Sequence, residues 1–179
     1  AAGLIAQITQ SSATVKQALE YCCEFANLGC SALPMSLAKK GGEYIVTLTP
    51  EQLWAKKSDT AVKHTAEGVL AFTVKEFHNL TRNKHYPTKV HLPWKLEGEL
   101  AEYQRVFGCD VYFEQNEIAM FFKQEHIEEK VVTSDYGLLR VLVAHAQTKL
   151  EQMEQNNFVT VVQRSVLVLT KPQFPTIEE

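Results

Sequence analysis

The chain has 179 residues, of which 45% are hydrophobic and 22% are charged, and its formal net charge is −3. This length fits one domain, or one domain with a short piece of another, and the apolar content is too high for a chain that stays disordered. A membrane span is excluded as well, because no stretch reaches the roughly 18 consecutive apolar residues that it requires.

Charge is spread unevenly along the sequence. Residues 1–57 hold five basic and four acidic residues, residues 58–98 hold six and four, and residues 99–179 hold seven and thirteen. Phosphate binding requires a clustered positive face, and no segment has one. The sequence therefore predicts that this piece does not itself bind nucleic acid.

The N-terminus and the cysteines indicate where the protein works. Residues 1–5 contain neither an initiator Met nor a basic stretch, so they do not form a signal peptide and are expected to follow a cut inside a longer protein. The four cysteines form no Cys-x-x-Cys pair, which favours free thiols in the reducing cytoplasm.

The first predicted element is a helix that begins near Thr14. Thr14 and Gln17 have the spacing of a capping box. In such a box the threonine hydroxyl accepts a hydrogen bond from the backbone N–H of the glutamine, and the glutamine side chain accepts one from the backbone N–H at the start of the helix. Apolar residues then recur at helical spacing up to Ala26, and Gly29 is expected just after the end.

A hairpin and a second helix follow. Residues 33–38 and 44–48 have strand character on either side of a turn with two glycines. Residues 51–58 are expected to be a connection, and a helix with an N-cap at position 58 or 59 is predicted to run to about Leu80.

The next segment is predicted to add a strand, a short helix and a second hairpin. Residues 89–92 form the strand and residues 99–107 the helix, which Gly108 ends. Residues 109–113 and 117–122 are expected to pair with each other around a turn at Gln115 and Asn116.

The last long helix is predicted over residues 134–153, with a break at Asn156 and Asn157. Residues 158–169 are compatible with a helix or a strand. Strands and helices thus mix without strict alternation, which predicts an α+β fold with a mostly antiparallel sheet covered by helices.

A heptad-like seam runs along this last helix and is the candidate dimer contact. Its spacing is that of helices that pack along one face. The alternative is that the same residues pack within their own chain. The seam consists of Tyr136, Leu139, Val143, Ala146, Leu150 and Met153.

Signals for catalysis, metals and cofactors are weak. The motifs of hydrolases, metalloproteases and nucleotide-binding enzymes are absent from the sequence. His85 and His91 come closest to a metal pair, but no further ligand completes a set around them. The charged residues 125–129 are interpreted as a loop or helical turn, and no catalytic residue, metal or cofactor is predicted.

Aromatic residues with a polar group provide the candidate pocket residues. Such side chains are common in small-molecule pockets and equally common in cores and interfaces. The candidates are Tyr44, Trp54, Trp94 and Tyr103.

Residues 103–113, Tyr-Gln-Arg-Val-Phe-Gly-Cys-Asp-Val-Tyr-Phe, resemble a Tyr-x-x-x-Phe-Gly-x-x-Val-x-Phe segment of bacterial AraC/XylS-type transcription regulators. In these regulators the segment lies in the N-terminal, arabinose-binding-type regulatory domain. Residues 12–21 and 90–93 resemble two further stretches of that domain, although Leu92 stands where an aromatic residue is commoner. At the other end, Pro-Thr-Ile-Glu-Glu at 175–179 is similar to the start of the family's helix-turn-helix domain.

The resemblance implies an effector-sensing and dimerising domain over residues 1–155. Residues 156–179 would then be a linker and the start of a DNA-binding domain that is mostly absent. The implied partners are a small-molecule effector of unknown identity, bound near the four aromatic candidates, and a second copy of the chain. DNA would be bound only through the absent domain, in the cytoplasm.

Two other readings stay open at this stage. One is a protein-interaction domain without a small-molecule ligand. The other is a small cytoplasmic enzyme, which would need a polar cleft with converging His, Cys or carboxylate groups.

Overall fold

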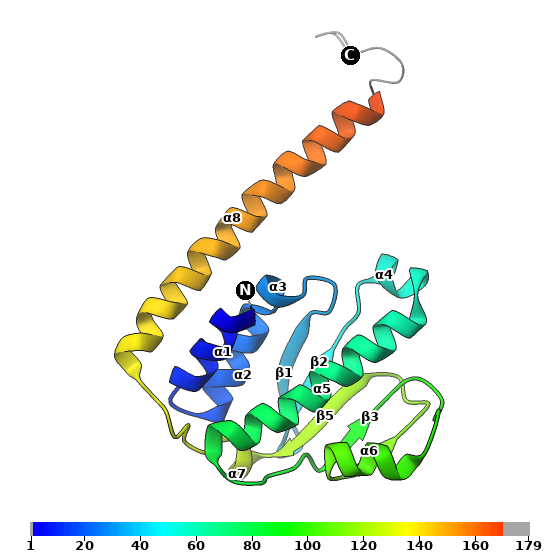
Figure 1. Cartoon of the computed structure of the whole chain (residues 1–179), viewed down its shortest axis with the longest axis vertical. Helices are drawn as coiled ribbons and strands as arrows, with labels where there is room; N and C mark the ends of the chain where they lie inside the picture. The colour runs from blue at the N-terminus through cyan, green and yellow to red at the C-terminus, as the bar shows by residue number, and fades with distance from the viewer. Residues whose placement is uncertain (1, 170–179) are drawn as a thin grey trace.

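The structure is a computed structural model that describes residues 2–169 (Figure 1), with the side chains of 3–155, 161–163 and 166. The helices are α1 (Ala2–Ser11), α2 (Val15–Glu24), α3 (Ala26–Gly29), α4 (Gln52–Lys57), α5 (Asp59–Thr81), α6 (Leu100–Phe107), α7 (Gln124–Ile127) and α8 (Tyr136–Leu169). The strands are β1 (Met35–Lys40), β2 (Glu43–Leu48), β3 (Lys89–His91), β4 (Asp110–Tyr112) and β5 (Ile118–Lys123). The predicted α+β class, with a mostly antiparallel sheet, is confirmed.

The five strands form one sheet in the order β1-β2-β5-β3-β4. The first hairpin is confirmed, since β1 and β2 pair in antiparallel fashion around Gly41 and Gly42, both of which have positive φ. Strand β5 is antiparallel to both of its neighbours, β2 and β3, whereas β3 and β4 run parallel.

The second predicted hairpin is wrong, because β3 lies between β4 and β5. Strand β5 pairs with β2 on one edge and with β3 on the other, and five of its residues are buried, whereas β4 buries only Val111 and lies at the sheet edge. Parallel strands require a crossover connection, and α6 provides it between β3 and β4.

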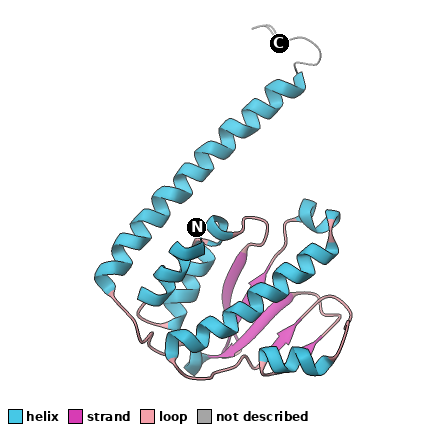
Figure 2. Cartoon of the chain, viewed as in Figure 1, coloured by secondary structure: helices cyan, strands magenta, loops and turns pink. Residues whose placement is uncertain are grey.

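Helix α5 crosses the sheet and forms the main core with it (Figure 2). The N-cap prediction is confirmed, since Ser58 Oγ accepts a hydrogen bond from Ala61 N at 3.2 Å. One stripe of the helix is buried against the strands. The ring of Phe77 on this stripe stacks on the ring of Phe122 on β5, with centroids 5.0 Å apart. The stripe consists of Ala66, Leu70, Val74 and Phe77.

Helix α2 starts at the predicted capping box. Thr14 Oγ1 accepts from Gln17 N at 3.2 Å, and Gln17 Oε1 accepts from Ala13 N at 2.7 Å. The helix ends at Glu24, earlier than predicted, and α3 follows as a separate turn that reaches Gly29. Helix α1 precedes this box and had no counterpart in the sequence prediction.

Helix α8 runs without interruption through Asn156 and Asn157, so the predicted break is wrong. Asparagine in a helix interior costs only some tenths of a kcal/mol relative to alanine, far less than proline. The proposed domain boundary at 155/156 falls inside this helix. The residues similar to a helix-turn-helix start, 175–179, lie outside the described residues.

The base of α8 packs against α1 and α3. Leu139 and Ala146 are buried there in a second apolar cluster, together with Ile8, Phe25 and Leu28. Further along, α8 extends away from the rest of the chain (Figure 1).

We expect Phe122→Ala to lower the free energy of unfolding by about 3–5 kcal/mol, because it leaves a cavity under α5. Urea denaturation measures this loss. The matched variant Phe72→Ala removes a ring on α5 that is 56% exposed. We therefore expect it to lower the free energy of unfolding by about 1 kcal/mol or less. Equal losses in the two variants would contradict the placement of Phe122 in the core.

Candidate functional site

A cavity of about 320 Å³ lies between α1, α2 and α5. This volume is at the lower end of the range for small-molecule pockets, which are about 300–1,000 Å³. Most of the lining side chains are apolar. They include Ile5, Ala6, Val15, Ala18, Leu19, Ala26, Leu33, Met35, Val69, Phe72, Phe77 and Leu80.

Helix α5 can contribute to this cavity because it uses two stripes. While one stripe packs on the sheet, residues at positions 69, 73, 76 and 80 follow the helical repeat along the adjacent flank. That flank faces α1 and α2 across the cavity. Sequence reasoning missed the cavity; a usable signal was the flank itself, on which Glu76 shares a helical stripe with Val69, Thr73 and Leu80.

The polar groups of the cavity differ in how they are satisfied. The hydroxyls of Thr9 and Thr73 donate to the carbonyl oxygens of Ala6, at 2.8 Å, and Val69, at 2.9 Å. Glu76 Oε1 accepts from Asn79 Nδ2 at 3.0 Å. Glu76 Oε2 is buried and has no hydrogen-bond partner among the described residues.

Two cysteines line the same cavity. Burial, followed by the nearby Cys23 and Glu76, raises the pKa of the Cys22 thiol to about 12. Cys22 is therefore a protonated, unreactive thiol at neutral pH. Cys30 is exposed, and both are free cysteines.

The four aromatic candidates lie away from this cavity. Tyr44 is buried in the main core, and Trp54 packs on that core's surface. Trp94 and Tyr103 do come together, because Glu67 Oε1 accepts from Trp94 Nε1 at 3.0 Å and from the Tyr103 hydroxyl at 2.9 Å. Burial and the bond to Glu67 raise the pKa of Tyr103 to about 12.

Trp94 also lines a second, more polar hollow of about 540 Å³ near the start of α5. Lys63 Nζ donates to Glu97 Oε2 there at 2.6 Å. This bond and the charge of Lys63 lower the pKa of the Glu97 carboxyl. Because Lys63 and Glu97 bind each other, these two charged groups of the lining are not both free to bind a ligand.

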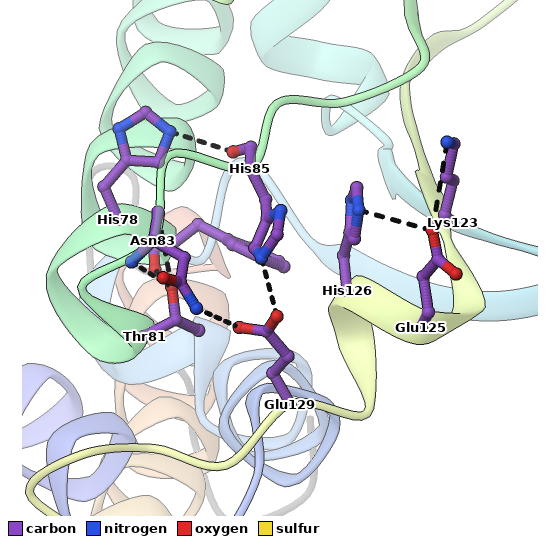
Figure 3. A network of polar contacts seen from close by, with 9 residues as sticks. His78, Thr81, Asn83, His85, Lys123, Glu125, His126 and Glu129 are labelled. Carbon is purple, nitrogen blue, oxygen red and sulfur yellow. Dashed lines mark hydrogen bonds and ion pairs between the residues drawn. The ribbon is translucent and has the colours of Figure 1, made fainter.

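A histidine network ties the loop after α5 to the segment after α7 (Figure 3). His85 Nε2 lies 2.6 Å from Glu129 Oε1, and the His85 ring stacks on that of His126 with centroids 4.0 Å apart. His91 instead lies beside Glu117, so the two histidines considered for a metal pair have different partners. Within residues 2–169, no group of three or more suitable side chains could hold a metal ion.

The residues of the predicted dimer seam take several positions. Leu139 and Ala146 are buried against α1 and α3, and Val143 and Leu150 pack at the edge of the same cluster. Met153 is 37% exposed and Tyr136 is 74% exposed. The intrachain alternative therefore accounts for the four middle residues of the seam and not for its two ends.

Residues 1–131 match the family model of the N-terminal arabinose-binding domain of AraC transcription regulators, and the chain belongs to this family. A crystal structure of the transcriptional regulator CdpR from Pseudomonas aeruginosa is similar, with a TM-score of 0.62 and 17% sequence identity. The match covers 79% of this chain and 45% of that chain, so the chain spans less than half of CdpR. At this identity the likeness concerns the fold.

Among curated proteins, none matches the chain significantly. The family and CdpR are transcriptional regulators and not enzymes. In the part of the chain that the structure describes, no helix has the length and apolar character to cross a membrane.

We expect the stability of the protein to fall between about pH 7 and pH 5 partly because of His126. Burial, and next the neighbouring His85, lower the pKa of His126, against opposite effects of Glu125 and Glu129. Below the unfolded pKa of about 6.5, the unfolded state binds a proton that the native ring resists, so acid favours unfolding.

Urea denaturation of His126→Gln should therefore show a smaller loss of unfolding free energy over this pH range than the wild type. His145→Gln, on an exposed face of α8, serves as the matched control and should keep the wild-type slope. An unchanged slope in His126→Gln would contradict the prediction.

Proposed function

We propose that this chain is the effector-sensing regulatory domain of an AraC-type transcription regulator. A small molecule would bind in the cavity between α1, α2 and α5, and its binding would be transmitted through α8 to a C-terminal helix-turn-helix domain. The observation that carries the proposal is the position of α1, which lies between the cavity and the base of α8.

One side of α1 lines the cavity with Ile5, Ala6 and Thr9. Another side supplies Ile8, which is buried against α8, and Leu4, which packs beside it. Ile5 belongs to both environments. A ligand that changes the position of α1 therefore also changes the surface on which α8 packs.

Hydrogen bonds join the same two elements. At the C-terminal end of α1, Ser11 O accepts from Asp135 N at 3.0 Å, and Gln10 O accepts from Thr133 Oγ1 at 2.6 Å. Residues 133–135 lead directly into α8. These contacts favour joint movement of α1 and the start of α8, and an effector shifts that equilibrium by its differential affinity for the two arrangements.

The test is a small-molecule screen by thermal shift, because a ligand that binds only the native state raises the melting temperature. Ala26→Phe places a ring into the cavity, whereas Ala101→Phe adds the same ring at an exposed position on α6. Compounds that stabilise the wild type should stabilise Ala101→Phe equally, and Ala26→Phe should lose at least about tenfold in affinity for them.

Hydrogen exchange of the wild type provides the second readout of this experiment. Bound compound should slow exchange in α1 and in the first turns of α8, while α6 stays unchanged. A screen without any stabilising compound would favour the protein-interaction reading instead. Binding that Ala26→Phe leaves intact would place the effector elsewhere.

We further propose that the chain acts as a homodimer in the cytoplasm. The free cysteines support a reducing compartment. For the dimer contact, the later part of α8 is better suited than its buried base, because it exposes apolar side chains. These are Met153, 37% exposed, Val162, 44% exposed, and Val166, 41% exposed.

We expect Val162→Glu combined with Val166→Glu to convert a dimer into a monomer, because charges in an apolar contact are costly. Light scattering measures the mass in solution. Leu139→Glu is unsuitable for this purpose, since its buried side chain supports the fold itself. An exposed pair of the same kind on another element, Val106→Glu with Leu100→Glu on α6, should leave the mass unchanged. Unchanged association in the α8 variant would contradict the proposed contact.

A further inference from the structure

The cavity holds one buried polar atom without a partner among the described residues, in a lining that is mostly apolar. Glu76 is the only charged side chain among its described lining residues. One oxygen of this carboxylate is engaged by Asn79, and the other, Oε2, is buried with no partner among the described residues. The hydroxyls of Thr9 and Thr73 are already used by backbone carbonyls of their own helices.

A buried carboxylate oxygen without a donor is costly, and a charged or hydrogen-bonded partner offsets the cost. Within the described lining, no Lys or Arg is placed to do so. A metal ion is a poor candidate, because no group of three or more suitable ligands exists among residues 2–169. A donor carried by the ligand satisfies the geometry.

We propose, resting on the function proposed above, that the cavity takes a small apolar molecule that carries one primary ammonium group, with Glu76 as its counterion. The aliphatic and aromatic walls would hold the apolar body of the ligand. The ammonium group would donate to Oε2, forming a charge-assisted hydrogen bond, which is stronger than a neutral one.

The polar groups of the cavity lining also argue against two other classes of ligand. A free sugar brings several hydroxyls that each need a donor and an acceptor, and a mostly apolar lining, whose threonine hydroxyls already donate to their own helices, would leave many of these groups unsatisfied. A carboxylate ligand would be repelled by Glu76 and would meet protonated Cys22 as a weak donor only. The name of the family therefore does not describe the ligand that this cavity suits.

The experiment uses four probes at pH 7: phenethylamine, 2-phenylethanol, 3-phenylpropanoate and L-arabinose. The first three share an aromatic body and differ at the polar end. Isothermal titration calorimetry and thermal shift measure their binding to the 179-residue chain. We expect phenethylamine to bind at least about tenfold more tightly than 2-phenylethanol, since its ammonium group adds the attraction of opposite charges to the hydrogen bond that either probe can donate to the carboxylate. The anion and the sugar should not raise the melting temperature.

Glu76→Gln is the deciding variant, because it keeps the size of the side chain and removes the charge. Its affinity for phenethylamine should fall at least about tenfold, while its affinity for 2-phenylethanol stays within about twofold of the wild type. Glu24→Gln makes the same change at an exposed position on α2 and should bind all four probes as the wild type does. The melting temperature of ligand-free Glu76→Gln, equal to or above that of the wild type, shows that the variant folds.

Each alternative outcome overturns the ammonium subsite. Equal binding of phenethylamine and 2-phenylethanol, or undiminished amine binding by Glu76→Gln, would show that the cavity takes ligands without this selection, and the proposed function would stand. Binding of L-arabinose in preference to the amine would reverse the assignment. If none of the probes binds, the subsite is rejected, whereas the broader screen with Ala26→Phe tests ligand sensing independently.

Discussion

The burial of one stripe of α5 against β2 and β5 is the interaction on which the other features depend. The stripe ends in the stacked pair Phe77 and Phe122, which fixes the rotation of the helix about its axis. Once that rotation is set, the positions of all other side chains on α5 follow. Loss of the apolar contact would therefore disturb polar features that lie on other sides of the helix.

Three of these features lie along the length of α5. Near its start, Lys63 reaches Glu97, and one turn later Glu67 binds Trp94 and Tyr103, so that the loop after β3 and helix α6 are held to it. Near its end, Glu76 enters the cavity shared with α1 and α2. A single helix thus positions an ion pair and two hydrogen bonds towards one end and the candidate effector site towards the other.

Local sequence signals predicted the local elements well. The hydroxyl of Thr14, the N-cap Ser58 and the two glycines of the first hairpin all act within a few residues of their own position, and the structure confirms them. The family resemblance, which rested on a few short segments, is likewise confirmed.

Features that depend on distant parts of the chain could not be predicted in this way. Strand β4 and strand β5 are neighbours in sequence, but β3 pairs with both of them and lies between them in the sheet. The cavity needs side chains from four helices, α1, α2, α3 and α5, and the first of these gave no recognised signal. Trp94 and Tyr103 both donate hydrogen bonds to Glu67. Because Glu67 is distant from them in the sequence, no local pattern predicted this contact.

The length of α8 has a mechanical consequence. The helix has 34 residues, and the part beyond Leu150 extends about 29 Å at a rise of 1.5 Å per residue. In the transmission proposed above, this part would turn about the contact between α8 and α1, so a tilt of about 5° at the base would displace the far end by about 2.5 Å at that length. In the dimer proposed above, a rearrangement around the cavity smaller than an atom's diameter would thereby be amplified into a shift large enough to change how the two proposed DNA-binding domains face each other.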